Sequence, residues 1–297
     1  MALALSSPKP IQTVGIITKR NIFEHPQTVK QLVKFLKQHK KEVVLDENCY
    51  QIFKGEKGYN KEELLHKVDM AIVLGGDGTL LKTARRIPRK RVFILGVNFG
   101  TLGFLTECGP HKIYDCLEKI FQGQYILDKR SLLRATVYRK GKKISTSLAL
   151  NDAVINQGAF ARLIKMDIEI NNRKVTSVNA DGLIIATPSG STAHSLSAGG
   201  PIVHPKIEGI VITPICPSSL AMRAIVLPDS RQLTISIETH RKLEQETVIG
   251  LTLDGQEVMN LKFGDQIKIR RSSRAFYLVR TANNYYKMLR GKLGWGE

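Results

Sequence analysis

Asp77 lies in a glycine-rich stretch, residues 75–79 (GGDGT), that directly follows the apolar run 70–74. Glycine permits positive φ angles and lets a ligand approach the main chain closely. With a strand before the glycines and a helix after them, the turn is a phosphate-binding geometry, because free N–H groups and the helix dipole favour an anion. A carboxylate there can remove the proton from a hydroxyl that attacks a phosphoryl group, directly or through Mg²⁺. The alternative is a tight turn in which Asp77 only caps the helix.

Several other chemistries lack their sequence patterns. The spacing around Asp77 fits neither a P-loop nor the dinucleotide-binding GxGxxG pattern. No G-x-S-x-G motif of a serine hydrolase surrounds Ser189 or Ser191. The sequence contains no HExxH, EF-hand loop or CxxC pair, so we expect no metal cage built by the protein alone.

The cysteines and the apolar runs bear on the cellular compartment. The four cysteines form no CxxC pair, so we expect free thiols in a reducing cytoplasm, with a buried structural thiol at Cys216. The apolar runs are too short to span a bilayer, and residues 1–10 lack the basic start of a signal peptide. We therefore expect a cytoplasmic protein.

The elements that position Asp77 alternate between strands and helices. Apolar periodicity predicts helices around 29–36 and 113–120, the second stopped by Gly123. Buried strands are predicted at 14–18, 42–46, 70–74 and 92–97. Strands separated by helices imply parallel βαβ units.

After about residue 125 the pattern changes to antiparallel β structure. Hairpins are predicted in 132–150 at a Gly-Lys turn, in 166–178 at Asn171 and Asn172, and in 248–258 at Asp254–Gly255, and period-two alternation marks 232–239 as a strand. Residues 281–295 are expected to form a helix that packs back on the first half. These patterns divide the chain into 1–125, 126–275 and a C-terminal segment, 276–297.

The formal net charge of +19 attracts polyanions, namely nucleic acid, acidic membranes or nucleotide phosphates. Aromatic residues make up only 6% of the chain and no RNP-type motif is visible, which argues against nucleic acid. Arg85, Arg86 and Arg223 are candidates to neutralise nucleotide phosphates. The alternative for each is an exposed charge with no ligand.

Two stretches together indicate a family. GGDGT is shared by phosphofructokinases, diacylglycerol and sphingosine kinases, and NAD kinases. The segment 181–205 (DGLIIATPSGSTAHSLSAGGPIVHP) resembles the long signature of bacterial-type NAD kinases. Further similarities in order and spacing are NFGTLGFLT (98–106), LND (150–152), LDGQ (253–256) and KLGW (292–295). The resemblance covers nearly the whole chain beyond the first ten residues.

The resemblance implies ATP-dependent phosphorylation of the 2′-hydroxyl of the adenosine ribose of NAD, giving NADP, with Mg²⁺ or Mn²⁺ accompanying ATP. It implies an α/β plus β fold, in which a Rossmann-like α/β domain precedes a mainly antiparallel, β-sandwich-like domain that holds most of the NAD. The C-terminal helix returns to the first domain. The family also implies a homodimer or homotetramer.

The resemblance assigns roles residue by residue. Asp77 resembles the family's proton acceptor. Close to the phosphates lie Gly76, Gly78 and Thr79. Asn151 and Asp152 match a pair that holds ribose hydroxyls, although many relatives carry Glu at the second position. Without the other motifs, a turn before the following strand is the preferred interpretation of this pair.

Other residues match NAD contacts of the family. Asp181 resembles a residue that contacts NAD, in some members across a subunit interface. The remaining candidates are Arg162, Asn179, Thr192, Ala193, His194, Ser195, Leu196, Ser197 and Gln256. His194 replaces the tyrosine common at its position, and an imidazole buries less area than a phenol. The alternative for Gln256 is a polar residue that flanks the hairpin turn.

Three competing functions remain open at this point. A lipid or sugar kinase with a GGDGT loop would want an open apolar groove and would not need the segments 151–153 and 189–200. A nucleic-acid-binding protein would show binding that falls steeply with salt and needs no mononucleotide. A catalytically dead NAD-binding regulator is disfavoured by the intact Asp77 and its glycine loop.

Overall fold

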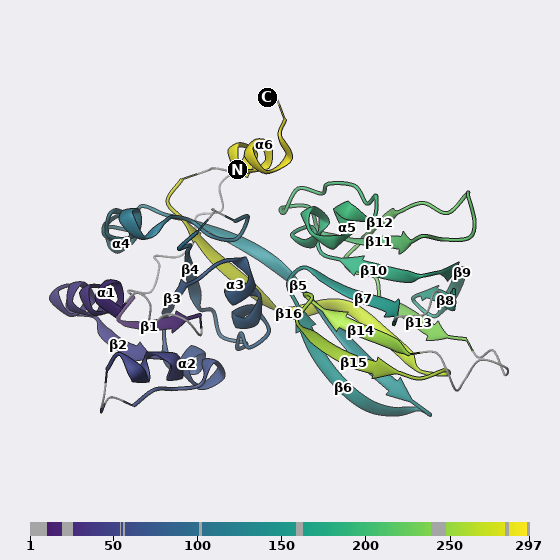
Figure 1. Ribbon diagram of the computed structural model, residues 1–297, viewed down its shortest axis with the longest axis horizontal. Helices are drawn as coiled ribbons and strands as arrows, with labels where there is room; N and C mark the ends of the chain where they lie inside the picture. The colour runs from purple at the N-terminus through teal and green to yellow at the C-terminus, as the bar shows by residue number, and fades with distance from the viewer. Residues whose placement is uncertain are drawn as a thin grey trace. The chain divides into compact units, whose positions relative to one another are not determined.

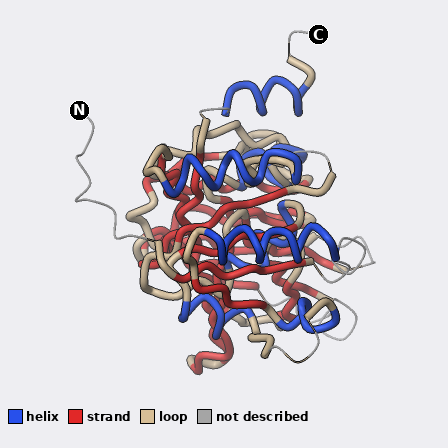
Figure 2. Tube along the Cα trace, turned by 90° about the vertical axis from the view of Figure 1, so that its left-hand side faces the viewer, coloured by secondary structure: helices blue, strands red, loops and turns tan. Residues whose placement is uncertain are grey.

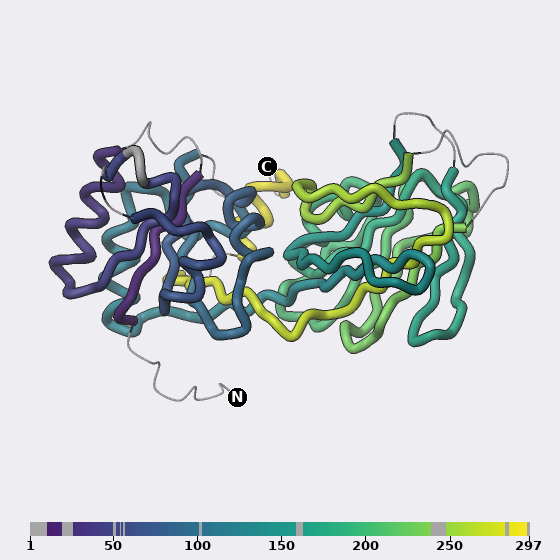
Figure 3. Tube along the Cα trace, turned by 90° about the horizontal axis from the view of Figure 1, so that it is seen from below, coloured from purple at the N-terminus to yellow at the C-terminus, as the bar shows by residue number. Residues whose placement is uncertain are grey.

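The computed structural model describes residues 11–19, 26–53, 55, 57–100, 103–158, 163–238, 248–282 and 285–295. The chain divides into two compact units. One consists of Met1–Lys129 with Phe276–Glu297, and the other of Arg130–Ala275. Two long strands, β5 (Ile126–Arg139) and β16 (Gln266–Arg280), continue from one unit into the other (Figure 3).

The first unit is built on a parallel sheet with the strand order β2-β1-β3-β4-β16 (Figure 1). Its strands are β1 (Thr13–Thr18), β2 (Glu42–Leu45), β3 (Met70–Leu74), β4 (Phe93–Val97) and the end of β16. Every residue of β3 and β4 is buried, as expected for a parallel sheet with both faces covered. The predicted βαβ organisation is confirmed.

Helices pack against both faces of this sheet, and several of them lie in front of the strands in Figure 2. The α-helices are α1 (Pro26–Gln38), α2 (Lys61–Lys67), α3 (Asp77–Ala84), α4 (Ile113–Phe121) and α6 (Tyr285–Leu293), and two short 3₁₀ helices span Glu47–Gln51 and Pro110–Lys112. The apolar sides of α1 and α4 share one core with the sheet. On the other face, glycines allow close packing, because a Cβ at Gly96 would lie only 2.8 Å from Leu80 of α3.

The second unit contains two antiparallel sheets around one apolar core. One sheet has the order β12 (Ile225–Pro228), β11 (Gly209–Ile215), β10 (Gly182–Ala186), β7 (Asp152–Gln157), β14 (Ile249–Leu253), β15 (Glu257–Leu261). The other contains β16, β13 (Leu233–Ile237), β8 (Ile164–Ile170), β9 (Arg173–Ala180), β5 and β6 (Lys142–Ala149). An α/β unit and a mainly antiparallel β unit are therefore confirmed.

Each predicted hairpin turns on two residues with positive φ, although the first turns one residue earlier than the Gly-Lys pair predicted from the sequence. The pairs are Lys140–Gly141 (49° and 74°), Asn171–Asn172 (50° and 61°) and Asp254–Gly255 (52° and 63°). This is the type I′ pattern that suits the twist of a two-residue hairpin. Glycine, asparagine and aspartate tolerate positive φ, so the sequence signal has a physical cause.

One expectation about the cysteines is wrong. Cys216 is exposed and has a φ of 44°, because it follows the last residue of β11 and turns the chain out of the sheet. Cys49, Cys108 and Cys116 are buried, unoxidised thiols. Among the described helices, none has the length and apolar character needed to cross a membrane.

Candidate functional site

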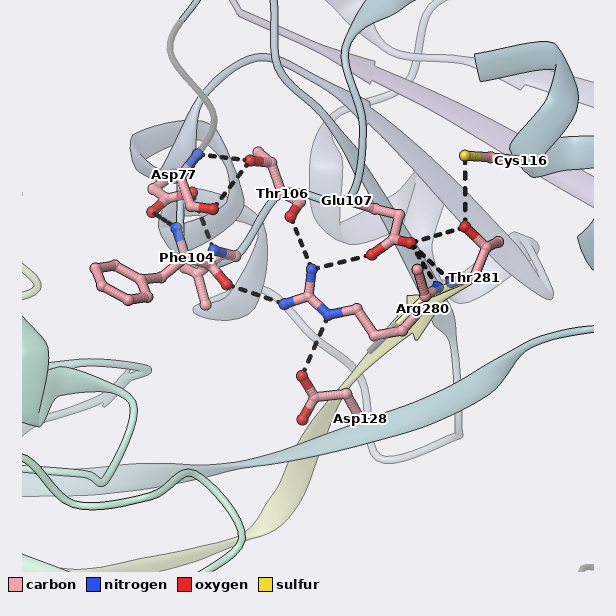
Figure 4. A network of polar contacts seen from close by, with 11 residues as sticks. Asp77, Phe104, Thr106, Glu107, Cys116, Asp128, Arg280 and Thr281 are labelled. Atoms are coloured by element: carbon pink, nitrogen blue, oxygen red, sulfur yellow. Dashed lines mark hydrogen bonds and ion pairs between the residues drawn. The ribbon is translucent and has the colours of Figure 1, made fainter. Parts of the chain in front are cut away.

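Asp77 is the first residue of α3, directly after the buried strand β3 and the two glycines. Its carboxylate is turned toward the segment 103–106, which lies after β4. Oδ2 accepts the main-chain N–H of Phe104 at 3.0 Å and Oδ1 that of Leu105 at 3.2 Å (Figure 4). Asp77 therefore does more than cap a helix, because its two oxygens are fixed by a loop 27 and 28 residues further along the chain.

Two glycines make room for this arrangement. A Cβ at Gly103 would overlap the Asp77 carboxylate, and a Cβ at Gly75 would overlap the side chain of Thr79. By contrast, a Cβ at Gly76 would meet only Asn98 Oδ1, at 3.8 Å. A side chain at Gly76, the residue before α3, would therefore meet no close neighbour among the described residues.

The pKa of Asp77 is raised above the ordinary aspartate value by burial. The N–H bonds from Leu105 and Phe104 and the positive charges of Arg280 and Lys292 work in the opposite direction. A carboxylate with a raised pKa is a stronger base than a free one, and the N–H bonds hold it in one orientation. Both properties suit proton abstraction.

Arg280, the last residue of β16, binds the other side of the same segment (Figure 4). Its guanidinium donates to the carbonyl oxygens of Thr106 at 2.7 Å and Phe104 at 2.9 Å. It also pairs with Asp128 at 3.3 Å and Glu107 at 3.4 Å. Phe104 and Thr106 lie in the similarity at 98–106, but Arg280, Glu107 and Asp128 were not identified from the sequence.

In the second unit, Asp254 organises the Asn151–Asp152 pair. Its carboxylate accepts the main-chain N–H groups of Asn151 at 2.7 Å, Leu150 at 3.1 Å and Asp152 at 3.3 Å. In return, the N–H of Asp254 donates to the carbonyl oxygen of Asp152 at 3.0 Å. From the sequence alone, Asp254 is predicted only to be a hairpin residue, although it belongs to the LDGQ similarity.

The Asp152 side chain is almost fully buried at the start of β7. Burial and the negative charge of Asp254 raise its pKa to about 7. Asp152 therefore takes up a proton near neutral pH.

The turn after β10 is hydrogen-bonded to the main chain at Asn151. Thr187 donates its N–H to the Asn151 carbonyl at 2.8 Å and its hydroxyl to the Leu150 carbonyl at 2.6 Å. A Cβ at Gly190 would overlap the Asn151 main chain, so only glycine fits there. Arg130 holds the same turn by donating to Ser189 at 2.9 Å. The Asn151–Asp152 pair and the segment that begins at Gly190 therefore lie side by side.

The candidates in 192–197 occupy a 3₁₀ turn and the short helix α5 (His194–Ser197). The side chains of His194 and Ser197 are exposed, whereas Thr192, Ala193 and Leu196 are half-buried. Ser195 is buried, and its hydroxyl lies 2.8 Å from that of Thr213 in β11. Ser195 thus holds α5 against the sheet.

The remaining candidates lie elsewhere. Asp181 precedes β10, half-buried, with Gln157 donating to its carboxylate at 3.5 Å. Asn179 is exposed in β9, and Gln256 is half-buried in the turn after β14. Arg162 lies outside the described residues. Arg223 donates to the carbonyls of Leu220 and Met222 within its own loop, so part of its hydrogen-bonding capacity is used locally.

Comparison with known proteins now adds a second line of evidence. Residues 14–125 match the family model of the ATP-NAD kinase N-terminal domain, and residues 150–281 match that of the C-terminal domain. A curated NAD kinase of Syntrophotalea carbinolica is 42% identical over 97% of this chain and 100% of its own length. One of Geobacter sulfurreducens is 46% identical over 82% of this chain and 84% of its own.

Solved structures of an NADH kinase and an NAD kinase also match this chain. Yeast NADH kinase in complex with NADH superposes with a TM-score of 0.88 at 26% identity, covering 98% of this chain and 89% of the other. An NAD kinase from Archaeoglobus fulgidus in complex with ATP gives a TM-score of 0.70 at 25% identity, covering 95% and 99%. Together with the phosphate-type loop at Asp77, these matches show that the chain belongs to the ATP-NAD kinase family, whose members phosphorylate NAD to NADP with ATP.

Proposed function

We propose that Asp77 is the proton acceptor in the phosphorylation of NAD. The ribose 2′-oxygen attacks the γ-phosphorus of ATP, the bond to the β–γ bridging oxygen breaks, and ADP leaves. The proton of the 2′-hydroxyl passes to the Asp77 carboxylate. The observation that carries this proposal is a half-buried carboxylate with a raised pKa, anchored by two main-chain N–H groups at the start of α3.

The experiment compares Asp77→Asn with the wild type. The amide keeps the size of the side chain but cannot accept the proton, so we expect kcat to fall by about 10² to 10⁴, with little change in NAD affinity by calorimetry. NADP formation from NAD, ATP and Mg²⁺ is followed with a cycling dehydrogenase. Asp115→Asn, at an exposed position of α4, is the matched control. Equal loss of binding and turnover in a folded variant would show that Asp77 positions substrate instead.

We further propose that the second unit supplies the NAD contacts. The main-chain N–H and carbonyl of Asn151 are engaged by Asp254 and Thr187, so its side-chain amide is left for a ligand. An amide both donates and accepts, and a carboxylate such as Asp152 accepts, so the two together suit vicinal ribose hydroxyls. The other proposed contacts are Arg162, Asn179, Thr192, Ala193, His194, Leu196, Ser197 and Gln256, with Ser195 acting through the packing of α5.

The phosphates of ATP are proposed to approach the first turn of α3, at Gly76, Gly78 and Thr79. A divalent metal is expected with the ATP. Mg²⁺ prefers oxygen ligands and retains water, so it is expected to be held mainly by phosphate oxygens and water. When bound, it neutralises charge on the transferring phosphoryl group.

We also propose that the chain forms a homodimer or homotetramer and that it acts in the cytoplasm. Asp181 precedes β10, whereas the segment at Gly190 follows it. Because a strand rises about 3.3 Å per residue, six residue steps separate Asp181 from Thr187 by roughly 20 Å. Asp181 is therefore suited to contact NAD bound by a second copy of the chain. Sedimentation of the purified protein tests the assembly.

A further inference from the structure

Arg280 stands out because it acts on the same four-residue segment as Asp77. The parallel pairing of Tyr277 with Phe93 and of Leu278 with Ile94 brings the end of β16 beside β4. The segment 103–106 comes from the loop that folds back on β4, where Glu107 donates its N–H to the Gly96 carbonyl at 2.8 Å. The fold therefore places Arg280 beside this segment.

The segment 103–106 is bound from two sides. The N–H groups of Phe104 and Leu105 donate to Asp77, and the carbonyls of Phe104 and Thr106 accept from Arg280. Phe104 is shared, because its N–H binds the carboxylate while its carbonyl binds the guanidinium. Gly103 cannot carry a side chain without overlapping Asp77. Any shift of this segment consequently moves the hydrogen-bond donors of Asp77.

The guanidinium of Arg280 is itself fixed. It pairs with Glu107 and Asp128, and its side chain is only 15% exposed. Glu107 accepts the N–H of Thr281 at 2.7 Å and its hydroxyl at 2.8 Å (Figure 4). A planar guanidinium with several donors can bind two carbonyls and two carboxylates at once, which an ammonium cannot do in the same geometry.

We propose that Arg280 is a positioning residue for phosphoryl transfer. It holds the segment 103–106 so that two N–H groups orient the Asp77 carboxylate, and its positive charge favours the ionised form that accepts the proton. The charged groups acting on Asp77 are Arg280 from β16 and Lys292 from α6. This inference rests on the proposed role of Asp77 as proton acceptor.

Two substitutions of Arg280 separate the effect of its hydrogen-bond geometry from the effect of its positive charge. Arg280→Met removes both, so we expect kcat to fall by about tenfold to a hundredfold, NAD KM to change little, and the acid limb of the kcat–pH profile to move to higher pH. Arg280→Lys keeps the charge but loses the planar fork. Its acid limb should stay near that of the wild type, while kcat still falls.

A matched control breaks a similar ion pair in the second unit. Arg139 binds Asp265 through two contacts, at 2.8 Å and 2.7 Å. Arg139→Met should lower the thermal midpoint without moving the acid limb. If Arg280→Met behaves in the same way, the residue is only structural and the inference is wrong. If Arg280→Met does not fold, Arg280→Lys carries the test, and unchanged kcat in that variant overturns the inference.

A double variant, Asp77→Asn with Arg280→Met, distinguishes the role proposed for Asp77 from the role proposed for Arg280. If Asp77 is the base and Arg280 acts through it, Arg280→Met should reduce the residual turnover of Asp77→Asn far less than it reduces that of the wild type. If Asp77→Asn retains normal turnover, the proposed function fails. If Asp77→Asn is inactive but Arg280→Met has a normal kcat and acid limb, only the positioning role fails.

Discussion

The carboxylate of Asp254 lies 2.7 Å from the main-chain nitrogen of Asn151. With the contacts to Leu150 and Asp152, it fixes the start of β7 through the hairpin turn between β14 and β15. The hairpin residue and the proposed ribose-binding pair are therefore one unit. We therefore expect substitutions at Asp254 to weaken the binding of NAD.

Asp254→Asn tests this unit. An amide offers one acceptor oxygen in place of two, and its NH₂ would face a main-chain N–H, so we expect the free energy of unfolding to fall by about 1–3 kcal/mol. NAD KM should rise by about tenfold, with ATP KM unchanged. Asp167→Asn, in strand β8 between β13 and β9, removes a carboxylate that is bound by exposed Lys174 and serves as the control. Equal effects on both KM values would contradict a specific role toward NAD.

The raised pKa of Asp152 makes stability depend on pH. Its pKa is about 7 in the folded protein and 3.8 ordinarily, so the folded state binds more protons between these values. The contribution to stability is therefore fully present below pH 4 and is lost as the pH rises to 7. One pH unit of separation corresponds to about 1.4 kcal/mol, which sets an upper limit of about 4 kcal/mol.

Denaturant unfolding between pH 4 and 8 checks this sign. Asp152→Asn cannot titrate, so its stability should depend less on pH than that of the wild type across the window. A steeper loss of stability in the wild type as the pH rises is expected. Parallel stability curves for the two proteins would show that Asp152 does not carry the proton.

Gly103→Ala tests the close approach between the segment 103–106 and Asp77. The added methyl group would overlap the carboxylate, so either the side chain or the segment must move. We expect kcat to fall by about a hundredfold. Gly291→Ala, in α6 where an added Cβ meets nothing within 4 Å, should leave kcat unchanged. Normal turnover in Gly103→Ala would mean that Asp77 tolerates displacement.

Local chemistry accounts for what could be predicted from the sequence. Period-two and helical patterns mark apolar faces, and Asn171–Asn172 and Asp254–Gly255 mark turns because few residues accept positive φ. The loop at Asp77 was predictable for the same reason. These signals lie within a few residues of one another, so no tertiary contact is needed to interpret them.

The partners of the key carboxylates could not be predicted in this way. Phe104 and Leu105 bind Asp77 through main-chain N–H groups, which every residue except proline possesses. Arg280 is 203 positions after Asp77 in the sequence and carries no local motif. Only the parallel pairing of β16 with β4 brings them to one segment.

Asp181→Ala tests the assembly together with the NAD contact. We expect weaker NAD binding, by about tenfold, with ATP binding less affected. If Asp181 serves NAD bound by a second copy, a mixture of Asp181→Ala and Asp77→Asn subunits should recover activity. A mixed oligomer contains sites in which an intact Asp77 from one chain meets an intact Asp181 from the other. Each variant alone lacks such a site.

The recovery experiment uses subunits dissociated and reassembled together, with each variant reassembled alone as the control. Activity of the mixture above the mean of the two separate preparations is the expected result. Activity equal to that mean, from particles shown by sedimentation to be mixed, would place Asp181 at the NAD of its own chain. An unchanged dissociation constant for NAD in Asp181→Ala would remove the residue from the site altogether, because a carboxylate that contacts the ligand cannot be deleted without loss of binding energy.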